Sequence, residues 1–316
     1  MGKLLMILAS CLFFFTPILL SMPVFSWAHG FAGKRFFPTT LSVDDPFISD
    51  EFSFLFNYIH DPDGKTAEFS VDYSKRIFPH FGIEISDAFQ FVKPDGEKTQ
   101  HGFGNLELGA KYQFLTNASH EAILSIGLNA EIGDTGNSSV GADEFSTISP
   151  AFFFGKGFSD LPERLKYLRP LAITGVIGPN FPTRSENVTT TVNPDSGEIE
   201  QDVEQNPITL SYGFTIQYNL QYLQSFVRDI GLPVPLNRMI VVAEFPFETD
   251  LNRESAGDTT GFVNPGIIWF GKYIELGIEA QIPINERTGD HIGVLALIHF
   301  FIDDLFPNSL GRPIFH

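Results

Sequence analysis

Cysteine is almost absent from this chain of 316 residues, which contains only Cys11. Because Cys11 lies in an apolar N-terminal run, the rest of the chain can form no disulfide, cysteine zinc site or thiol nucleophile. Basic residues are also scarce, with 20 Lys and Arg against 38 Asp and Glu, a net charge of −18. This balance argues against nucleic acid as a partner, since phosphates need a basic surface. After the N-terminal run, no stretch reaches the roughly 18 apolar residues of a membrane helix, which excludes a polytopic helical membrane protein.

The N-terminus has the features of an export signal. Lys3 is followed by an apolar run over 4–20 and by Ser-Trp-Ala at 26–28. A basic start, an apolar core and small residues before a cleavage point are typical of a secretory signal peptide. We therefore expect residues 1–28 to be removed, so that the mature chain begins at His29. A lipoprotein signal ending at Cys11 and a retained single-span anchor are the alternatives.

The rest of the chain alternates apolar and polar residues over long segments. A period of two places successive side chains on opposite faces of a β-strand. The alternation is clearest over 105–114, 121–132, 208–221 and 274–284, with weaker copies near 52–59, 66–74, 81–91, 146–154, 168–178, 238–247, 262–270 and 291–301. These segments predict about twelve strands of about ten residues, the length of a tilted strand that crosses a bilayer.

Two folds would explain this alternation, a transmembrane barrel and a soluble sandwich of two sheets. Strands in soluble proteins average about five or six residues, and the segments here are longer. One face is rich in Gly, Ser, Thr and Asn, which suits a water-filled lumen, and the other is continuously apolar, which suits lipid. We therefore predict an all-β fold, a transmembrane antiparallel up-and-down β-barrel of about 12 strands, within a range of roughly 10–14.

The links between these segments alternate in character along the chain. The odd links are polar and comprise 60–65, 92–103, 133–145, 179–206, 248–260 and 285–290. The even links are 75–80, 115–120, 155–167, 222–237 and 271–272, and two of them have the pattern of helical turns. An up-and-down barrel sends the two sets to opposite ends, with the longer loops outside on average. The longest link, 179–206, is acidic, and we expect a solvated mobile loop there, with binding of divalent cations as the alternative.

The predicted organisation has three parts: a signal peptide (1–28), a leader or plug segment (29–50), and an outer-membrane barrel with a C-terminal tail (51–316). Eight-stranded barrels are filled by side chains and sixteen-stranded ones are open, so about twelve strands predict a narrow or partly plugged passage. The polar side chains expected to line the lumen are Glu107, Lys111, Glu121, Asn129, Glu131, Thr215, Gln217, Glu275, Glu279 and His299. Their surplus of carboxylates would favour cations over anions, unless these groups are paired across strands or simply solvated.

Neither a catalytic nor a metal-binding pattern stands out in the sequence. Ser125 and Ser211 fall on the inward face, but neither lies in a Gly-x-Ser-x-Gly turn or beside a histidine. The spacing of the histidines does not resemble a ligand set. We therefore predict no catalytic residues, no metal and no cofactor, and regard an enzyme as the less favoured class.

Several segments resemble a known family. The sequence Gly-Phe-Gly-Asn-Leu-Glu-Leu-Gly-Ala-Lys-Tyr at 102–112 resembles a strand motif of the outer-membrane family associated with phenol-degradation pathways, as do segments 167–172, 263–266 and 300–306. Segment 29–38 is similar to the mature start of exported proteins of that type from Gram-negative bacteria. The resemblance implies an outer-membrane barrel that transports hydrophobic or aromatic compounds. The chain departs from many such barrels in its last residue, since the aromatic Phe315 is followed by His316.

Together these patterns predict a channel in the bacterial cell outer membrane for passive uptake of small hydrophobic or aromatic solutes. Its expected partners are that solute, outer-membrane lipid and lipopolysaccharide, and not nucleic acid. Two alternatives stay open at this point. One is a structural or adhesive barrel without transport, and the other is an outer-membrane hydrolase.

Overall fold

The computed structural model describes residues 30–61, 64–192 and 199–315 of the chain. The predicted signal peptide, 1–28, lies outside these residues. Strands dominate the described part, and its helices are single turns or little more. None of these helices is long and apolar enough to cross a membrane.

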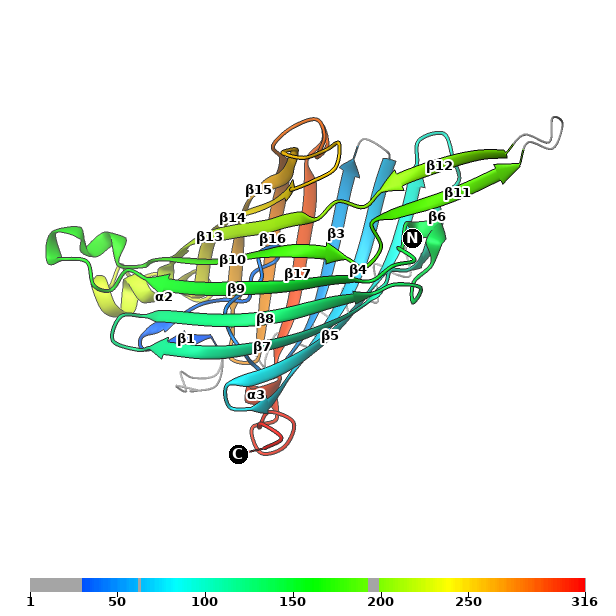
Figure 1. The fold of residues 1–316 in the computed structure, drawn as a ribbon. Helices are drawn as coiled ribbons and strands as arrows, with labels where there is room; N and C mark the ends of the chain where they lie inside the picture. Colours follow the sequence, from blue (N-terminus) through cyan, green and yellow to red (C-terminus); the bar gives the residue numbers. More distant parts are fainter. Residues whose placement is uncertain (1–29, 62–63, 193–198, 316) are drawn as a thin grey trace, which may run out of the picture.

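Twelve long strands form the wall of a closed antiparallel barrel, as the prediction required (Figure 1). Neighbouring strands along the wall are hydrogen-bonded, and the last strand pairs with the first. Because of this closure, the backbone N–H and C=O groups of the edge strands are hydrogen-bonded, as is necessary in the hydrocarbon core of a membrane. The wall strands are β3 (Glu51–Asp61), β4 (Gly64–Phe78), β5 (Phe81–Pro94), β7 (Leu106–Asn117), β8 (Ala122–Ile132), β9 (Thr147–Gly157), β10 (Leu171–Pro182), β13 (Thr209–Asn219), β14 (Met239–Asp250), β15 (Thr259–Phe270), β16 (Ile274–Pro283) and β17 (Gly293–Phe301).

Two of the predicted links contain strands of their own. In 92–103, β6 (Gln100–Phe103) pairs with the last part of β5 and precedes β7. In 179–206, where we expected a mobile loop, β11 (Glu186–Val192) and β12 (Ile199–Gln205) form an antiparallel hairpin that projects beyond the wall (Figure 1). The run Val-Thr-Thr-Thr-Val at 188–192 has high β-propensity and explains why this segment forms strands. This propensity outweighs the acidic composition of the link.

The outward face of the wall is apolar. Ile278 is 58 % exposed, and Ile126 and Leu128 are each 50 % exposed. Along β16, the exposed Leu276 and Ile278 alternate with Glu275 and Glu279, which are buried on the inside. A continuous apolar band around a closed barrel is the surface that lipid covers. The fold and its exterior therefore place the protein in the bacterial outer membrane.

The two ends of the barrel differ. One end, which we call the hairpin end, carries the end of β3, the start of β4, the β8–β9, β14–β15 and β16–β17 links and the projecting hairpin (Figure 1). The other, the tail end, carries η3 (Glu163–Leu168), α2 (Leu220–Tyr222), η4 (Leu223–Val227) and the C-terminal α3 (Ile302–Leu305). The two links predicted to contain helical turns do contain them. Because outer loops are usually the longer ones, we expect the hairpin end to face outward.

Residues 30–50, which we call the leader, run inside the barrel. The leader begins near the tail end with the short pair β1 (Phe31–Ala32) and β2 (Arg35–Phe36). It then reaches the middle of the wall, where Leu41 contacts Glu244 of β14, and returns to the tail end, where Asp50 contacts Arg76 near the end of β4. The leader is therefore a loop that hangs in the lumen with its tip at residues 41–45.

Candidate functional site: the lumen and its leader

On one side of the wall, a carboxylate binds the tip of the leader. Glu244 of β14 is fully buried and accepts hydrogen bonds from the backbone N–H groups of Leu41 (2.7 Å), Ser42 (2.9 Å) and Val43 (2.6 Å). Consecutive N–H groups form a concave site for an anion, and here the anion is the Glu244 side chain. Asn264 of β15 adds a bond of 2.7 Å from Nδ2 to Ser42 Oγ. The tip is thereby fixed to the β14–β15 side.

The tip is also fixed to a distant part of the wall. Lys111 of β7 donates from Nζ to Asp44 Oδ1 and to the Asp45 backbone carbonyl, each at 2.8 Å. In the strand order of the barrel, four strands separate β7 from β14 along the shorter arc, which places them almost opposite each other. The leader tip therefore spans the lumen at mid-height.

At the tail end, the start of the leader is anchored by a buried ion pair. Arg35, which is fully buried, donates from Nε to Glu121 Oε2 at 3.2 Å and from Nη1 to the Pro170 carbonyl at 2.8 Å. Tyr222 completes the arrangement, because its hydroxyl donates to Glu121 Oε1 at 3.0 Å and its ring lies 3.9 Å from the guanidinium carbon. A buried pair that loses one partner leaves an uncompensated charge, which makes both members necessary.

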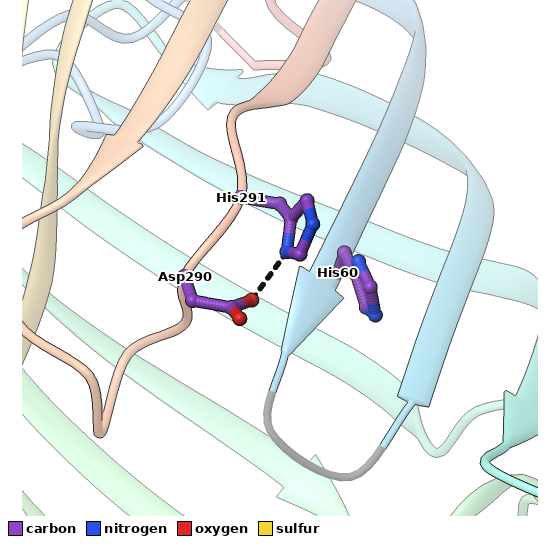
Figure 2. Close-up of side chains that lie close together, drawn as sticks. All are labelled: His60, Asp290 and His291. Atoms are coloured by element: carbon purple, nitrogen blue, oxygen red, sulfur yellow. Dashed lines mark hydrogen bonds and ion pairs between the residues drawn. The ribbon is translucent and has the colours of Figure 1, made fainter.

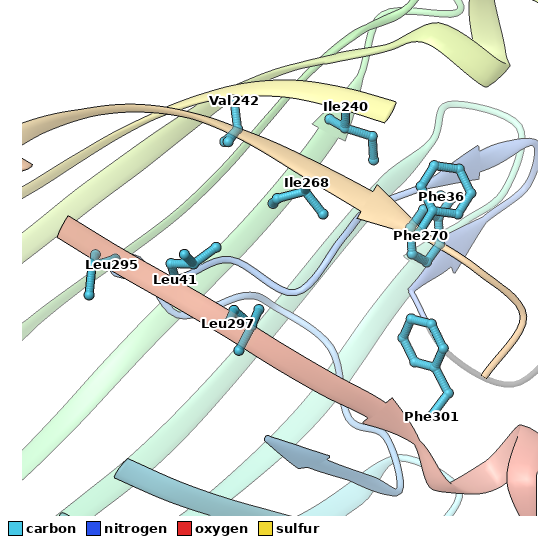
Figure 3. Close-up of a cluster of buried hydrophobic side chains, with 9 residues drawn as sticks. All are labelled: Phe36, Leu41, Ile240, Val242, Ile268, Phe270, Leu295, Leu297 and Phe301. Carbon is cyan, nitrogen blue, oxygen red and sulfur yellow. The ribbon is translucent and has the colours of Figure 1, made fainter. Parts of the chain in front are cut away.

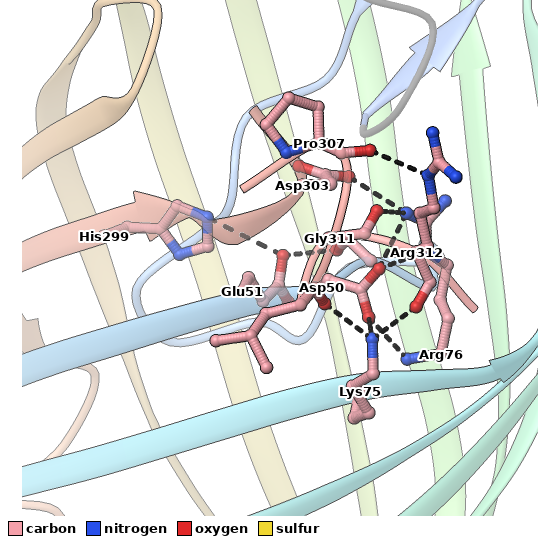
Figure 4. Close-up of polar contacts among 11 residues, drawn as sticks. Asp50, Glu51, Lys75, Arg76, His299, Asp303, Pro307, Gly311 and Arg312 are labelled. Carbon is pink, nitrogen blue, oxygen red and sulfur yellow. Dashed lines mark hydrogen bonds and ion pairs between the residues drawn. The ribbon is translucent and has the colours of Figure 1, made fainter. Parts of the chain in front are cut away.

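The end of the leader and the C-terminal tail share a second anchor (Figure 4). The carboxylate of Asp50 is buried and accepts from Lys75 Nζ at 2.7 Å and from Arg76 Nε at 2.8 Å. The same two basic side chains donate to tail carbonyls, Lys75 to Leu310 and Arg76 to Gly311. These bonds hold the leader, β4 and the tail together at the tail end of the lumen.

One side of the lumen is apolar rather than polar (Figure 3). Phe36 and Leu41 of the leader pack in a buried cluster with inward side chains of β14, β15 and β17. The wall members are Ile240, Val242, Ile268, Phe270, Leu295, Leu297 and Phe301. Burial of this apolar surface stabilises the leader inside the barrel, at about 25 cal/mol per Å² removed from water.

Above the tip, toward the hairpin end, the lumen opens into a cavity of about 650 Å³, which we call the vestibule. Its acidic lining residues are Asp44, Glu107, Glu131, Asp143, Glu248 and Asp250. None of the described residues that line it is basic. Apolar side chains, including Phe145 and Phe153, form part of the same lining. The vestibule therefore combines acidic groups, whose negative potential attracts cations, with a partly apolar lining.

A second cavity continues past the leader along β4, β5 and β7. This side cavity has a volume of about 370 Å³ and shares Ser42, Asp44, Glu107 and Asn129 with the vestibule lining. Its lining contains one basic residue, Lys111, which is paired with the leader. The lumen is thus divided into an apolar side filled by the leader and a polar side that is partly open.

The structure divides the predicted lumen residues into three groups. Glu107, Lys111, Asn129 and Glu131 line the two cavities. Glu121 lies at the Arg35 anchor near the tail end. The others, Thr215, Gln217, Glu275, Glu279 and His299, are buried on the inner wall and line neither of these cavities.

Lys111 and Glu121 were predicted as lumen residues, but no contact with the leader was expected for them. Glu244 of the wall and Arg35 and Asp50 of the leader had no predicted partner. A signal was present in the run Met-Ile-Val-Val at 239–242, where both strand faces are apolar. Such a strand is covered on both sides, by lipid outside and here by the leader inside.

The lumen also contains a serine, a histidine and a glutamate in proximity. Ser53 Oγ lies 2.8 Å from His299 Nδ1, and the other ring nitrogen lies 3.6 Å from a Glu51 oxygen, beyond hydrogen-bond distance. His299 is completely buried, with Thr39 of the leader also near its ring. Ser53 and Glu51 line the side cavity but His299 does not, so a substrate could not reach the ring while the leader is in place.

No family model matches the chain, and no curated protein matches its sequence. Solved structures do match its fold. An outer-membrane channel from Pseudomonas putida F1 superimposes with a TM-score of 0.52 and 11% identity, covering 84% of this chain and 99% of that one. The KdgM porin gives a TM-score of 0.44 with 12% identity over 78% of this chain and 98% of the porin. The NanC porin gives a TM-score of 0.45 with 8% identity, over 79% of this chain and 98% of the porin. At these identities the likeness to the Pseudomonas channel supports the barrel fold.

Proposed function

We propose that the protein is an outer-membrane channel for small solutes and that its own leader closes the lumen. The observation that carries this proposal is the attachment of the leader tip to nearly opposite walls, at Glu244 and Lys111. A structural barrel has no need of a wide vestibule above such a segment. A channel needs both a chamber that collects solute and an element that limits leakage.

The vestibule indicates the solute class. Its carboxylates repel anions, and the lack of a basic residue in the described lining leaves no group to bind a carboxylate or phosphate. Ala151, Val176 and Pro182, which are partly exposed, offer apolar surface to the solute in the same lining. These features support uncharged or cationic small molecules with an aromatic or hydrophobic part. That class agrees with the resemblance to the family associated with phenol-degradation pathways.

In the proposed mechanism, solute enters the vestibule from the hairpin end and reaches the side cavity beside the leader. Movement of the leader away from Lys111 and Glu244 then joins the two cavities to the tail end. Because the leader is also anchored by Arg35 and Asp50, the tip can detach while its two ends stay attached. The barrel wall itself does not have to change.

The test is solute-dependent swelling of liposomes that contain the mature protein or a variant lacking residues 30–48. A matched control lacks residues 187–204, a deletion of similar length in the projecting hairpin outside the lumen. The proposal expects faster swelling with aromatic amines and neutral aromatics after leader deletion, and wild-type rates in the control. Equal rates in the wild type and the leader deletion would refute the plug. Absence of swelling in every variant would refute a channel and favour a structural or adhesive barrel.

A further inference from the structure

Barrel closure brings together three potential metal ligands at the hairpin end (Figure 2). His60 lies one residue before the end of β3, whereas Asp290 and His291 lie in the link that precedes β17. These elements are the first and last strands of the wall, so the residues are neighbours only because β17 pairs with β3. The sequence spacing gave no hint of this contact, which is why we predicted no metal site.

The three side chains are already close in space. The imidazole rings of His60 and His291 have centroids 4.1 Å apart and planes tilted by 33°. His291 Nδ1 is hydrogen-bonded to a carboxylate oxygen of Asp290. One ligand atom from each residue can be chosen so that all three lie within 4.8 Å of one another.

We propose that His60, Asp290 and His291 bind one divalent transition-metal ion, for which Zn²⁺ is the natural probe. Two imidazoles and a carboxylate are a donor set that zinc accepts, with bonds of about 2.0–2.2 Å and a fourth position left for water. In a tetrahedral site the donors lie about 3.3 Å apart, so atoms now within 4.8 Å of one another must approach by at most about 1.5 Å. His291 and Asp290 can do so by rotation, because their side chains are 56% and 68% exposed.

The position of the site would let a bound ion connect two wall elements. A bound ion would tie the β16–β17 link directly to the end of β3, adding a bridge across the seam where the barrel closes. The site lies on the rim and shares no residue with the leader anchors or the described vestibule lining. It can therefore be tested independently of the proposed channel function.

The first experiment measures Zn²⁺ binding to the folded protein in detergent, purified without a polyhistidine tag, by competition with a chromophoric chelator. We expect one Zn²⁺ per chain. His60→Ala and His291→Ala should each weaken binding by at least about tenfold, as should Asp290→Asn. His101→Ala is the matched control, since His101 is an exposed histidine at the same end and should leave affinity unchanged. Wild-type affinity in any of the three ligand variants would overturn the assignment, as would absence of binding to the wild type.

A second experiment detects the bridge rather than the binding. Arg287 lies in the β16–β17 link with its side chain 54% exposed, so trypsin can cleave after it. Zn²⁺ should slow this cleavage at least severalfold in the wild type and in His101→Ala, but not in His60→Ala, whose altered residue lies on another strand. Equal protection in His60→Ala and the wild type would show that the ion does not connect the two strands, and would overturn the proposal.

Discussion

Removal of the Glu244 carboxylate should release the tip of the leader. In Glu244→Ala, the backbone N–H groups of Leu41, Ser42 and Val43 all lose their acceptor. A buried amide N–H that is left without a hydrogen-bond acceptor destabilises the folded state by about 1–3 kcal/mol. Taking the lower figure for each group gives about 3 kcal/mol, and since 1.4 kcal/mol is a factor of ten, release of the tip should rise about 100-fold.

A single introduced thiol can measure this release, because the chain has no cysteine after Cys11. Val43 is 1% exposed, so a Val43→Cys thiol should react slowly with a maleimide while the tip is bound and rapidly once it is free. The control is Glu248→Ala, which removes the same charge from the same strand but no bond to the leader. We expect faster labelling only with Glu244→Ala. Equal labelling rates in the two backgrounds would refute the assigned role of Glu244.

Three further predictions concern the vestibule, the leader base and the exterior. Replacing Glu107 and Glu131 together by Gln should lower the cation-over-anion permeability ratio of the leader-deleted channel, measured as a reversal potential in a salt gradient; an unchanged potential would contradict the vestibule assignment. Arg35→Ala should destabilise the docked leader by about 3–5 kcal/mol, because Glu121 stays buried without its partner, and protease protection of the leader should be lost; full protection would contradict this. Ile278→Arg should reduce barrel stability in lipid by about 2–4 kcal/mol if it lies near the bilayer midplane, as judged by urea unfolding in vesicles, and an unchanged midpoint would contradict the lipid-facing assignment.

Strand placement could be predicted from the sequence because most wall strands face lipid on one side and polar groups on the other. Along 274–283, Leu276 and Ile278 alternate with Glu275 and Glu279, and the structure assigns these pairs to the outside and the inside. The alternation of link types also gave the correct connectivity. The β11–β12 hairpin was missed because its acidic composition was weighted above the β-branched run at 188–192.

The leader anchors could not be predicted in the same way, because they join residues that no local pattern relates. Glu244 and Leu41 are far apart in sequence, and their contact depends on where an irregular segment lies inside the closed wall. Alternation identified Glu275 and Glu279 as inward residues, but it could not show that they are buried on the wall rather than exposed to solute. The His60–His291 contact has the same origin, since it depends on barrel closure.

In the proposed mechanism, the leader tip must leave the wall before solute can pass. The most direct test places cysteines at Ser42 and Asn264, whose side chains are hydrogen-bonded at 2.7 Å, and joins them with a short, reducible bis-thiol reagent. Channel currents are then recorded in planar bilayers before and after reduction. We expect no openings while the bridge is intact, and openings that return after reduction. Currents of the same size and frequency with the bridge intact would contradict it.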